Sequence, residues 1–419
     1  MNILKYKNAL QPNIMNLLNT KGLQAFISND LNLDLNAYLE NNNLNSNDEL
    51  QLRDKLNIVM NVIVNEKSKY KEELNSYLYN YIFNYELNNQ IIYSFNELDK
   101  DEIQIVINNL KNYIQNVAKV DVKSSNFFDI DKVEDSFYIL NKYEGKIEVL
   151  NRFFVNNYKN DKNSKSVFIG FEIDFANSMI SFKYNEKRIV DSYKQEGQNI
   201  ASNFSEMREF FLERLKKLTN DSLSLKIDNK EVDSNYYEKF LYDLFENDYK
   251  NKCLQFDNEI DSEIEDNLSE AVTNLDFHNI KAKTLIRNLK YYDIALGKTE
   301  LDYTGFVFSF QFKDHNVTSS RTAAKKHKPI YTSDIYWNLV QVALDKEKIT
   351  EVGILFDVEE NSKKYSQEVL LTSKNGYFMI KYYQYELAKS SGTNLQYKFE
   401  SRRVIDEHIK NKLTNFVSR

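Results

Sequence analysis

The sequence contains few of the residues that interrupt helices. Its 419 residues include two prolines, Pro12 and Pro329, and nine glycines, and no glycine lies between Gly22 and Gly145. Proline removes a backbone donor and glycine costs conformational entropy, so both are disfavoured inside helices. A stretch of 122 residues without either one therefore predicts a long helical region in the first part of the chain.

Cysteine is almost absent as well. With Cys253 as its one thiol, the chain cannot form an internal disulfide or hold a metal through several thiolates. The first residues lack the apolar core and the small-residue cleavage site of a signal peptide. No run of about 18 apolar residues occurs, which argues against a membrane span. We therefore expect a cytoplasmic protein with no membrane contact.

Motifs for nucleotide cofactors are missing. Neither GxxxxGK[ST] nor GxGxxG occurs in the sequence, which argues against P-loop hydrolases and dinucleotide enzymes. The four histidines are scattered along the chain and form no recognisable arrangement with a serine and an acid. The sequence therefore identifies no cofactor by motif, apart from the metal ion considered below.

The charge is distributed unevenly along the chain. The net charge is −7, yet residues 280–419 hold 23 Lys and Arg against 16 Asp and Glu, a net +7, which leaves −14 for residues 1–279. Clustered cations release counterions from nucleic-acid phosphates, so a basic C-terminal third suits an anionic partner. A drift in charge without any function is the alternative.

Apolar residues at helical spacing fill the glycine-free region. We predict helices at 46–67, 74–85 and 99–117, two shorter helices at 131–143 and 146–158, and a polar linker at 156–166. The tyrosines of the second helix could stack on bases. No Lys or Arg lies between Glu72 and Leu98, however, so packing is the better interpretation. Residues 1–160 are thus interpreted as a helical domain.

Strand patterns begin after residue 160. Alternating apolar residues and turn signals predict strands at 168–175, 180–184, 222–227, 305–313, 351–360, 368–383 and 395–403. Helices are expected at 203–218, 233–248, 258–275, 280–295, after Ser333 and at 405–417. Asn375 and Gly376 form the two-residue turn that hairpins favour. We predict an α+β protein with a mostly antiparallel sheet in residues 161–419, which a boundary near residue 298 would divide further.

The Phe-rich strand at 305–313 leads into a basic loop. Strict alternation would place its four phenylalanines, Phe306, Phe308, Phe310 and Phe312, on one face. The candidate nucleic-acid-binding residues are Lys313 at the end of this strand and then Arg321, Lys325, Lys326, His327 and Lys328. Cations on a loop beside a sheet suit a phosphate backbone, and a histidine adds a titrating contact. An ordinary solvated loop has the same composition, and that alternative stays open.

Three residues of the same region loosely resemble the metal-binding motif of the PD-(D/E)xK nucleases over some twelve residues. They are Asp302, Gln311 and Lys313. The resemblance implies a catalytic role for these residues and a divalent cation such as Mg²⁺, with the lysine steadying the attacking water. That family places its two acids on neighbouring strands. On one straight strand Asp302 and Gln311 would lie about 30 Å apart, so a shared metal requires a bend at Thr304 and Gly305.

Paired carboxylates occur at Glu172 and Asp174. They point to one side of a predicted strand and lie about 7 Å apart, which would suit metal binding or acid and base work. The outward, solvated face of an antiparallel sheet shows the same pattern, and we favour that interpretation.

Taken as a whole, these observations favour a nucleic-acid-interacting protein that contacts phosphates of DNA or RNA through its basic C-terminal part. The heavy use of Asn, Lys, Ile, Tyr and Phe, which share AT-rich codons, suggests a bacterial or mobile-element origin, where such a protein could serve a defence or regulatory system. Two alternatives remain. One is a protein-binding subunit of a multi-component system without nucleic-acid contact, and the other is a metal-dependent nuclease.

Overall fold

The computed structural model defines most of the chain. It describes residues 18–41, 51–65, 70–118, 136–143, 145–155, 165–189, 204–229, 234–257, 266–267, 270–271, 282–297, 305–313, 319–324, 328–346, 348–374, 377–383 and 393–417. Close contacts divide the chain into two compact units. Unit 1 comprises residues 1–231 and 384–406, and unit 2 comprises residues 232–383 and 407–419.

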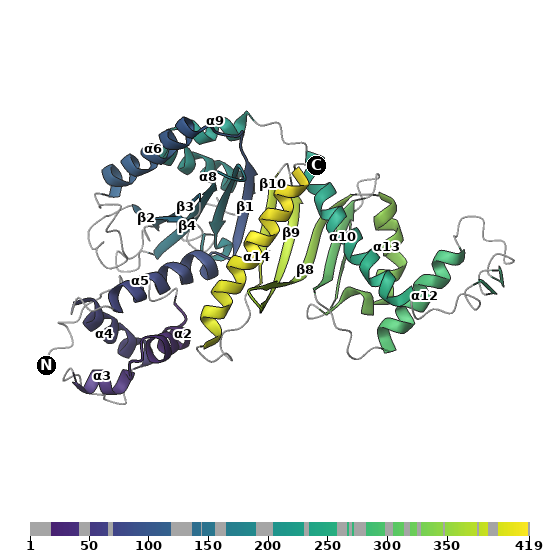
Figure 1. Ribbon diagram of the computed structural model, residues 1–419, viewed down its shortest axis with the longest axis horizontal. Coiled ribbons are helices and arrows are strands. Elements are labelled where there is room, and N and C mark those ends of the chain that lie inside the picture. Colours follow the sequence, from purple (N-terminus) through teal and green to yellow (C-terminus); the bar gives the residue numbers. More distant parts are fainter. Residues whose placement is uncertain are drawn as a thin grey trace. The chain divides into compact units, whose positions relative to one another are not determined.

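Both units combine helices with antiparallel strands, which confirms the predicted α+β class (Figure 1). One helix, α14 (Thr393–Val417), contributes its first part to unit 1 and its last part to unit 2. The boundaries near residues 160 and 298 between independently folding domains stay predictions. None of the helices in the described part of the chain has the length and apolar character needed to cross a membrane.

Unit 1 begins with helices. They are α2 (Thr20–Ala25), η2 (Phe26–Asp30), α3 (Leu35–Asn41), α4 (Leu52–Asn65), α5 (Tyr70–Tyr81), η3 (Ile82–Glu86) and α6 (Lys100–Ala118), followed later by α8 (Phe204–Thr219) and α9 (Ser222–Asp228). The start of α6 shows why these boundaries fall where they do. The Asp99 carboxylate accepts from the Glu102 amide at 2.8 Å, and the Glu102 carboxylate accepts from the Asp99 amide at 3.1 Å. This reciprocal pair satisfies two amides that the helix itself leaves free.

The sheet of unit 1 is antiparallel. Its strands are β1 (Asn89–Ser94), β2 (Ser136–Tyr143), β3 (Lys146–Val155), β4 (Lys165–Asp174) and β5 (Met179–Tyr184), in the order β2-β3-β4-β5-β1. Every residue of β1 and β5 is buried, so these strands are covered on both faces. On one face, Phe182 stacks on Phe211 of α8 with ring centroids 5.4 Å apart. Figure 1 shows α6, α8 and α9 on that side of the sheet and α5 on the other.

Several local predictions for unit 1 were wrong. The described parts of the predicted helices 131–143 and 146–158 form strands β2 and β3 instead, with Gly145 between them, whose φ of 76° suits a tight turn. Residues 222–227 form helix α9, because Leu223 and Ile227 are buried four residues apart while Leu225 is 53% exposed. Residues 395–403 lie in α14. The predicted linker at 156–166 lies almost entirely outside the described residues.

The tyrosines of α5 and η3 pack in the core, as the lack of neighbouring cations predicted. The rings of Tyr77, Tyr81 and Tyr85 surround Phe399 of α14, with centroid distances of 5.8, 5.9 and 6.0 Å. All four side chains are buried. Aromatic packing thus holds the first part of α14 in unit 1.

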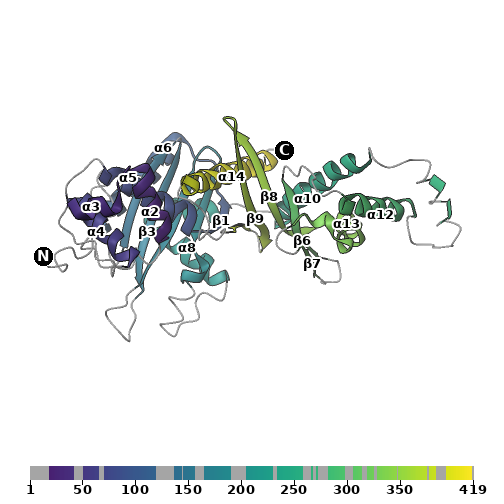
Figure 2. The same cartoon turned by 90° about the horizontal axis from the view of Figure 1, so that it is seen from below.

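Unit 2 consists of antiparallel strands with helices. The strands are β6 (Phe306–Lys313), β7 (Ser319–Ala323), β8 (Ile349–Glu360), β9 (Lys363–Lys374) and β10 (Tyr377–Tyr382), in the order β10-β9-β8-β6-β7. The helices are α10 (Ser234–Asp257), α12 (Ala282–Gly297), the short η7 (Ile330–Thr332) and α13 (Asp334–Lys346). Figure 2 shows β8 and β9 side by side, and the turn between them carries Asn361 and Ser362 at positive φ.

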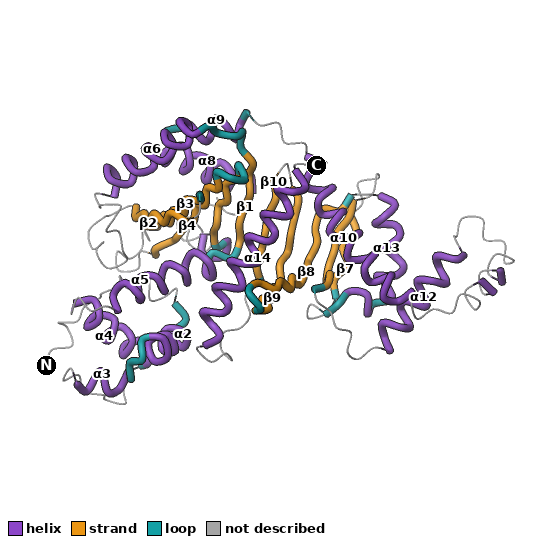
Figure 3. The backbone as a smooth tube through the Cα atoms, viewed as in Figure 1, coloured by secondary structure: helices purple, strands orange, loops and turns teal. Residues whose placement is uncertain are grey.

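The predicted pairing of β9 with β10 is confirmed, although the turn residues Asn375 and Gly376 lie outside the described residues. Helices cover one face of this sheet. Phe245 of α10 packs on Phe310 of β6 at 4.7 Å between ring centroids, and Tyr237 packs on Phe378 of β10 at 5.6 Å. Figure 3 shows α10 and α13 lying along these strands. The predicted helix at 258–275 falls mostly outside the described residues.

Close packing in unit 1 depends on Gly170 of β4. A Cβ atom at this position would lie 2.8 Å from Cε2 of Phe83, the η3 side chain that covers the sheet. We therefore expect Gly170→Ala to lower the free energy of unfolding by about 1 to 3 kcal/mol, through overpacking. Urea unfolding measures the loss. Because Phe83→Leu removes the clashing ring, the double variant should lose less than the sum of the two single losses, and simple additivity would contradict this explanation.

Candidate functional site

The structure describes only some of the residues that the sequence singled out. Asp302, Lys325, Lys326 and His327 lie outside the described residues. Gln311 is half-buried in β6, and Lys313 ends that strand, with its backbone paired to Ser319. Arg321 is exposed on β7, at the edge of the sheet, and Lys328 is exposed shortly after it.

The described residues add no metal ligand to the nuclease-like set of Asp302, Gln311 and Lys313. Gln311 and Lys313 lie two positions apart on one strand, and Asp302 is not described. Within the described ranges, no three His, Cys, Asp or Glu side chains are grouped so that they could hold a metal ion. The metal site therefore stays a prediction that depends on Asp302.

Arg321 and Gln311 lie on one face of the unit 2 strands. The helices of unit 2 make their aromatic contacts on the opposite face. The register partners of Arg321 and Gln311 in a row across the sheet are Glu351 of β8, Thr372 of β9 and Met379 of β10. Residues directly opposite each other in antiparallel strands point to the same face. None of these five side chains is fully buried. We call this side of the unit 2 strands the open face; further along the strands it also carries Phe306, Leu355, Asp357, Glu368, Leu370, Lys374, Lys381 and Tyr383.

The exposure of the β9 side chains alternates between the two faces of the strand. Its residues alternate between buried and half-exposed from Tyr365 to Ser373, and Lys374 at its end is exposed. The half-exposed residues share the face of Thr372. On β10, Lys381 is exposed and lies two positions beyond Met379. Lys374 and Lys381 thus add cations to the open face.

A shift in strand pairing brings aromatic side chains to the open face. The register of β6 against β8 slips by one residue between Val307 and Ser309, which leaves Phe308 as an extra residue. Phe306, opposite Leu355, therefore shares a face with Glu351, whereas Phe310 packs on the helices. The predicted placement of all four phenylalanines on one face was wrong, because a bulge reverses the alternation.

Phe308 lies across the open side of β8 because Gly353 has no side chain. A Cβ atom on Gly353 would meet the Phe308 ring and the Ser309 hydroxyl well inside normal contact distance. The ring extends as far as Tyr383, which follows β10, and meets it edge to face with centroids 5.8 Å apart. Phe308 is 1% exposed, while Tyr383 is half-buried. Tyr383 therefore forms part of the surface, and the buried ring of Phe308 lies beneath it.

Opposite charges are mixed near the centre of the open face. The Arg321 guanidinium lies 3.0 Å from the Glu351 carboxylate, whose side chain is only 12% exposed, whereas that of Arg321 is 55% exposed. Burial raises the pKa of Glu351 above its ordinary value, and Arg321 and Lys381 act in the opposite direction. Burial also raises the pKa of Tyr383, and the Glu351 charge adds to the increase.

Charge on the open face is divided along the strands. The exposed cations Arg321, Lys374 and Lys381 lie toward one end of the unit 2 strands. The register of the described strands places one acid, Glu351, among them. Toward the other end, Asp357 accepts a hydrogen bond from Ser366 and lies 3.5 Å from Lys364. The first end can attract an anion, whereas Asp357 at the second end is already paired with Lys364.

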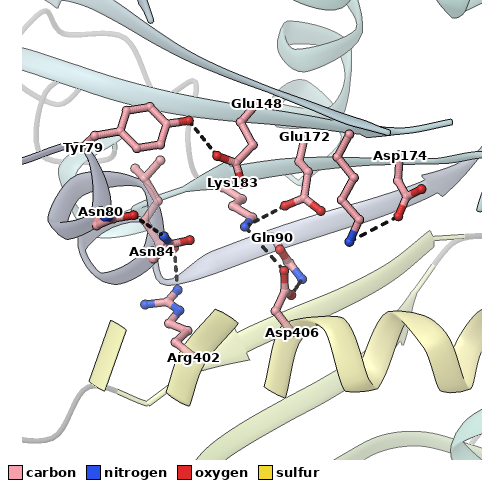
Figure 4. Close-up of polar contacts among 12 residues, drawn as sticks. Tyr79, Asn80, Asn84, Gln90, Glu148, Glu172, Asp174, Lys183, Arg402 and Asp406 are labelled. Carbon is pink, nitrogen blue, oxygen red and sulfur yellow. Dashed lines mark hydrogen bonds and ion pairs between the residues drawn. The ribbon is translucent and has the colours of Figure 1, made fainter. Parts of the chain in front are cut away.

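Unit 1 contains a second polar cluster, which is enclosed (Figure 4). The Lys183 ammonium of β5 lies 2.9 Å from the Glu172 carboxylate and 3.4 Å from the Asp406 carboxylate of α14. Gln90 of β1 donates a hydrogen bond to Asp406, and Lys146 lies 3.4 Å from Asp174. Glu172 and Asp174 are 5% and 2% exposed, so our interpretation of them as a solvated sheet face was wrong.

This second cluster attaches α14 to the sheet. The Lys183, Glu172 and Asp406 side chains are 8%, 6% and 8% exposed, which leaves a substrate little access to them. Beside them, Arg402 donates to the carbonyl oxygen of Tyr85 at 2.7 Å and to that of Leu87, at the end of η3. A cation suits the carbonyl end of a helix. We therefore assign these charges to packing and take the open face of unit 2 as the candidate functional site.

Sequence reasoning found part of the open face and missed the rest. Arg321 and Gln311 were among the candidates, but Lys381, Tyr383 and Glu351 were not. No motif joins them, because they come from different strands. The sequence matches no model of a known protein family and no curated protein, so the geometry alone supports a function.

The shared ammonium of Lys183 makes a test of the enclosed cluster possible. Lys183→Met would leave two buried carboxylates without their common cation, and we expect a loss of about 3 to 5 kcal/mol in unfolding free energy. The loss should be smaller at pH 5 than at pH 8, because buried carboxylates without a cation take up protons more readily. Urea unfolding at both pH values measures it.

The matched control for this test is Lys187→Met, which removes an exposed lysine of the same unit and should change stability by less than about 0.5 kcal/mol. If Lys183→Met were as mild as this control, the buried ion pairs would not be what holds α14 against the sheet.

Proposed function

We propose that this protein binds nucleic acid, DNA or RNA, through the open face of unit 2 and the basic segment that follows β7. The observation that supports the proposal most directly is the exposure of Arg321 and Lys381 on the same sheet face. Lys374 on this face and Lys328 beyond β7 are exposed too. Exposed cations gathered on one surface are the electrostatic feature expected of a protein that binds phosphate backbones.

The spacing of these cations fits an extended chain of phosphates better than a single anion. Arg321 and Lys381 stand on the two outermost strands of the unit 2 order, four strand spacings and one row apart. At about 4.8 Å per strand this corresponds to about 20 Å, which several nucleotides span. Lys313, Lys325, Lys326 and His327 would extend the same surface, if their side chains reach it.

The setting of this activity follows from the composition. An amino-acid composition typical of AT-rich codons favours a bacterial or mobile-element origin, and we propose a cytoplasmic location. We propose a role in a defence or regulatory system, in which binding of nucleic acid would be the chain's contribution.

A protein-binding role is the second candidate. Three large apolar side chains are more than two-fifths exposed on neighbouring helices: Leu289 of α12 at 58%, and Ile335 and Val342 of α13 at 54% and 42%. Isolated exposed apolar residues are common, but partner proteins also cover such positions. Copurification from the native host tests for this partner.

The nuclease alternative makes a separate requirement. It needs Asp302 to approach Gln311 and Lys313, and it needs a divalent cation. Incubation of DNA and RNA with the protein, with and without Mg²⁺, distinguishes cleavage from binding. Metal-dependent cleavage that Asp302→Asn abolishes would establish it.

Charge removal tests the binding proposal. In Arg321→Gln/Lys381→Gln we expect nucleic-acid affinity to fall by about tenfold at low salt, with a shallower dependence of affinity on salt concentration, because two phosphate contacts are lost. Fluorescence anisotropy titrations with a labelled oligonucleotide at several salt concentrations measure both quantities.

The matched control removes two exposed lysines of α10 instead, as Lys239→Gln/Lys250→Gln, and leaves the open face unchanged. The same net charge is lost in both variants, so the control isolates position from total charge. Equal weakening in both variants, or no binding by the unaltered protein, would refute the proposed surface.

A further inference from the structure

We propose that the open face binds the unpaired bases of single-stranded nucleic acid, in preference to a duplex. The inference rests on the proposed function and specifies its ligand. It is based on the aromatic and acidic side chains that lie among the cations of this face, which a purely electrostatic surface would not need.

Tyr383 supplies a ring whose position is fixed before any ligand binds. Its backbone amide donates to the carbonyl oxygen of Glu368 at 3.1 Å, and its own carbonyl oxygen accepts from the side-chain amide of Gln367 at 3.0 Å. The edge contact with Phe308 supports the ring from below. A half-buried tyrosine held in this way can stack on a base with little loss of side-chain freedom.

The surface beside Tyr383 is broad and carries apolar side chains as well as one acid. In register across the sheet, Tyr383 lies next to Glu368, then Leu355 and then Phe306, all of them half-exposed. Leu370 occupies the neighbouring row. Two aromatic side chains separated by about three strand spacings, or 14 Å, offer room for more than one unstacked base. Bases in a duplex are already stacked and paired, so they cannot use such a platform.

The acids of the open face also discriminate between the two forms. Glu351 lies in the row of Arg321, and Glu368 lies in the row of Tyr383 and Phe306. A carboxylate repels a phosphate that lies across it, yet it can accept hydrogen bonds from the amino groups of cytosine, adenine or guanine. Phosphates are therefore directed to Arg321 and Lys381, and bases to the row that holds Tyr383 and Phe306. A single strand can adopt this arrangement because its bases turn freely away from the backbone.

Lys381 and Tyr383 illustrate the expected contact. They are two positions apart at the end of β10, on the same face, and thus about 7 Å from each other. A phosphate at Lys381 and the adjoining base on Tyr383 would be contacted together. Because each stacked base contributes through its ring surface, the preference for particular bases should be slight.

The test compares labelled 12-nucleotide single strands of DNA and RNA with a blunt duplex of the same length, by fluorescence anisotropy. We expect the full-length protein to bind a single strand at least tenfold more tightly than the duplex. In Tyr383→Leu the affinity for single strands should fall by about 5- to 100-fold, as for the loss of one stacked base, while the salt dependence stays unchanged. Tyr292→Leu, which removes a half-buried ring of α12, is the matched control.

A second measurement uses the unaltered protein and does not depend on the folding of a variant. Ultraviolet crosslinking of the unaltered protein to a strand that contains 5-iodouridine, followed by peptide mapping, should identify peptides that contain Phe306 or Tyr383. Crosslinks confined to other peptides would overturn the inference. Equal affinity for single strand and duplex would do so too, and if Arg321→Gln/Lys381→Gln still weakened both, the proposed function would remain. Absence of binding to every probe would instead refute the proposed function itself.

Discussion

The register of β6 against β8 is the constraint on which the open face depends. One extra residue at Phe308 turns the first half of β6 over, so that Phe306 and Phe308 leave the helix-covered core while Phe310 and Phe312 stay in it. This slip is accommodated because Gly353 leaves room for a ring directly over the backbone of β8. Without that space, the Phe308 ring could not lie beneath Tyr383 and support it.

The two units resolve the problem of charged residues in a sheet in opposite ways. In unit 1 both faces are covered, so the charges of β4 and β5 are enclosed and Lys183 serves two carboxylates at once. Enclosed ion pairs add little net stability, but they strongly disfavour any arrangement that separates them. In unit 2 the charges stay at a surface with solvent access, where Arg321 and Lys381 remain available to a ligand. The first arrangement fixes a helix in place, and the second one can exchange water for phosphate.

Local patterns in the sequence were sufficient for the α+β class, for helices such as α6 and α10, and for the β4–β5 and β9–β10 hairpins. They failed where the deciding partner is distant. Gly353 determines the orientation of Phe308 from 45 residues away, and Asp406 explains the burial of Lys183 from more than 200 residues away. Glu172 looked solvated because alternation reveals two faces of a strand but not what covers each. The candidate site was found at Arg321 for its local charge, and missed at Tyr383 because its neighbours come from other strands.

The shared helix α14 has a consequence for the order of events during synthesis. Residues 1–231 of unit 1 are translated before unit 2, yet Arg402 and Asp406 of unit 1 follow residues 232–383 of unit 2. At common rates of translation, Lys183 and Glu172 wait about 10 to 45 s for their partner. During that interval the nascent chain carries an incomplete core with buried charge. Unit 1 is therefore completed only after most of unit 2 has been made, and a nascent chain that stalls in between would be a natural client of chaperones.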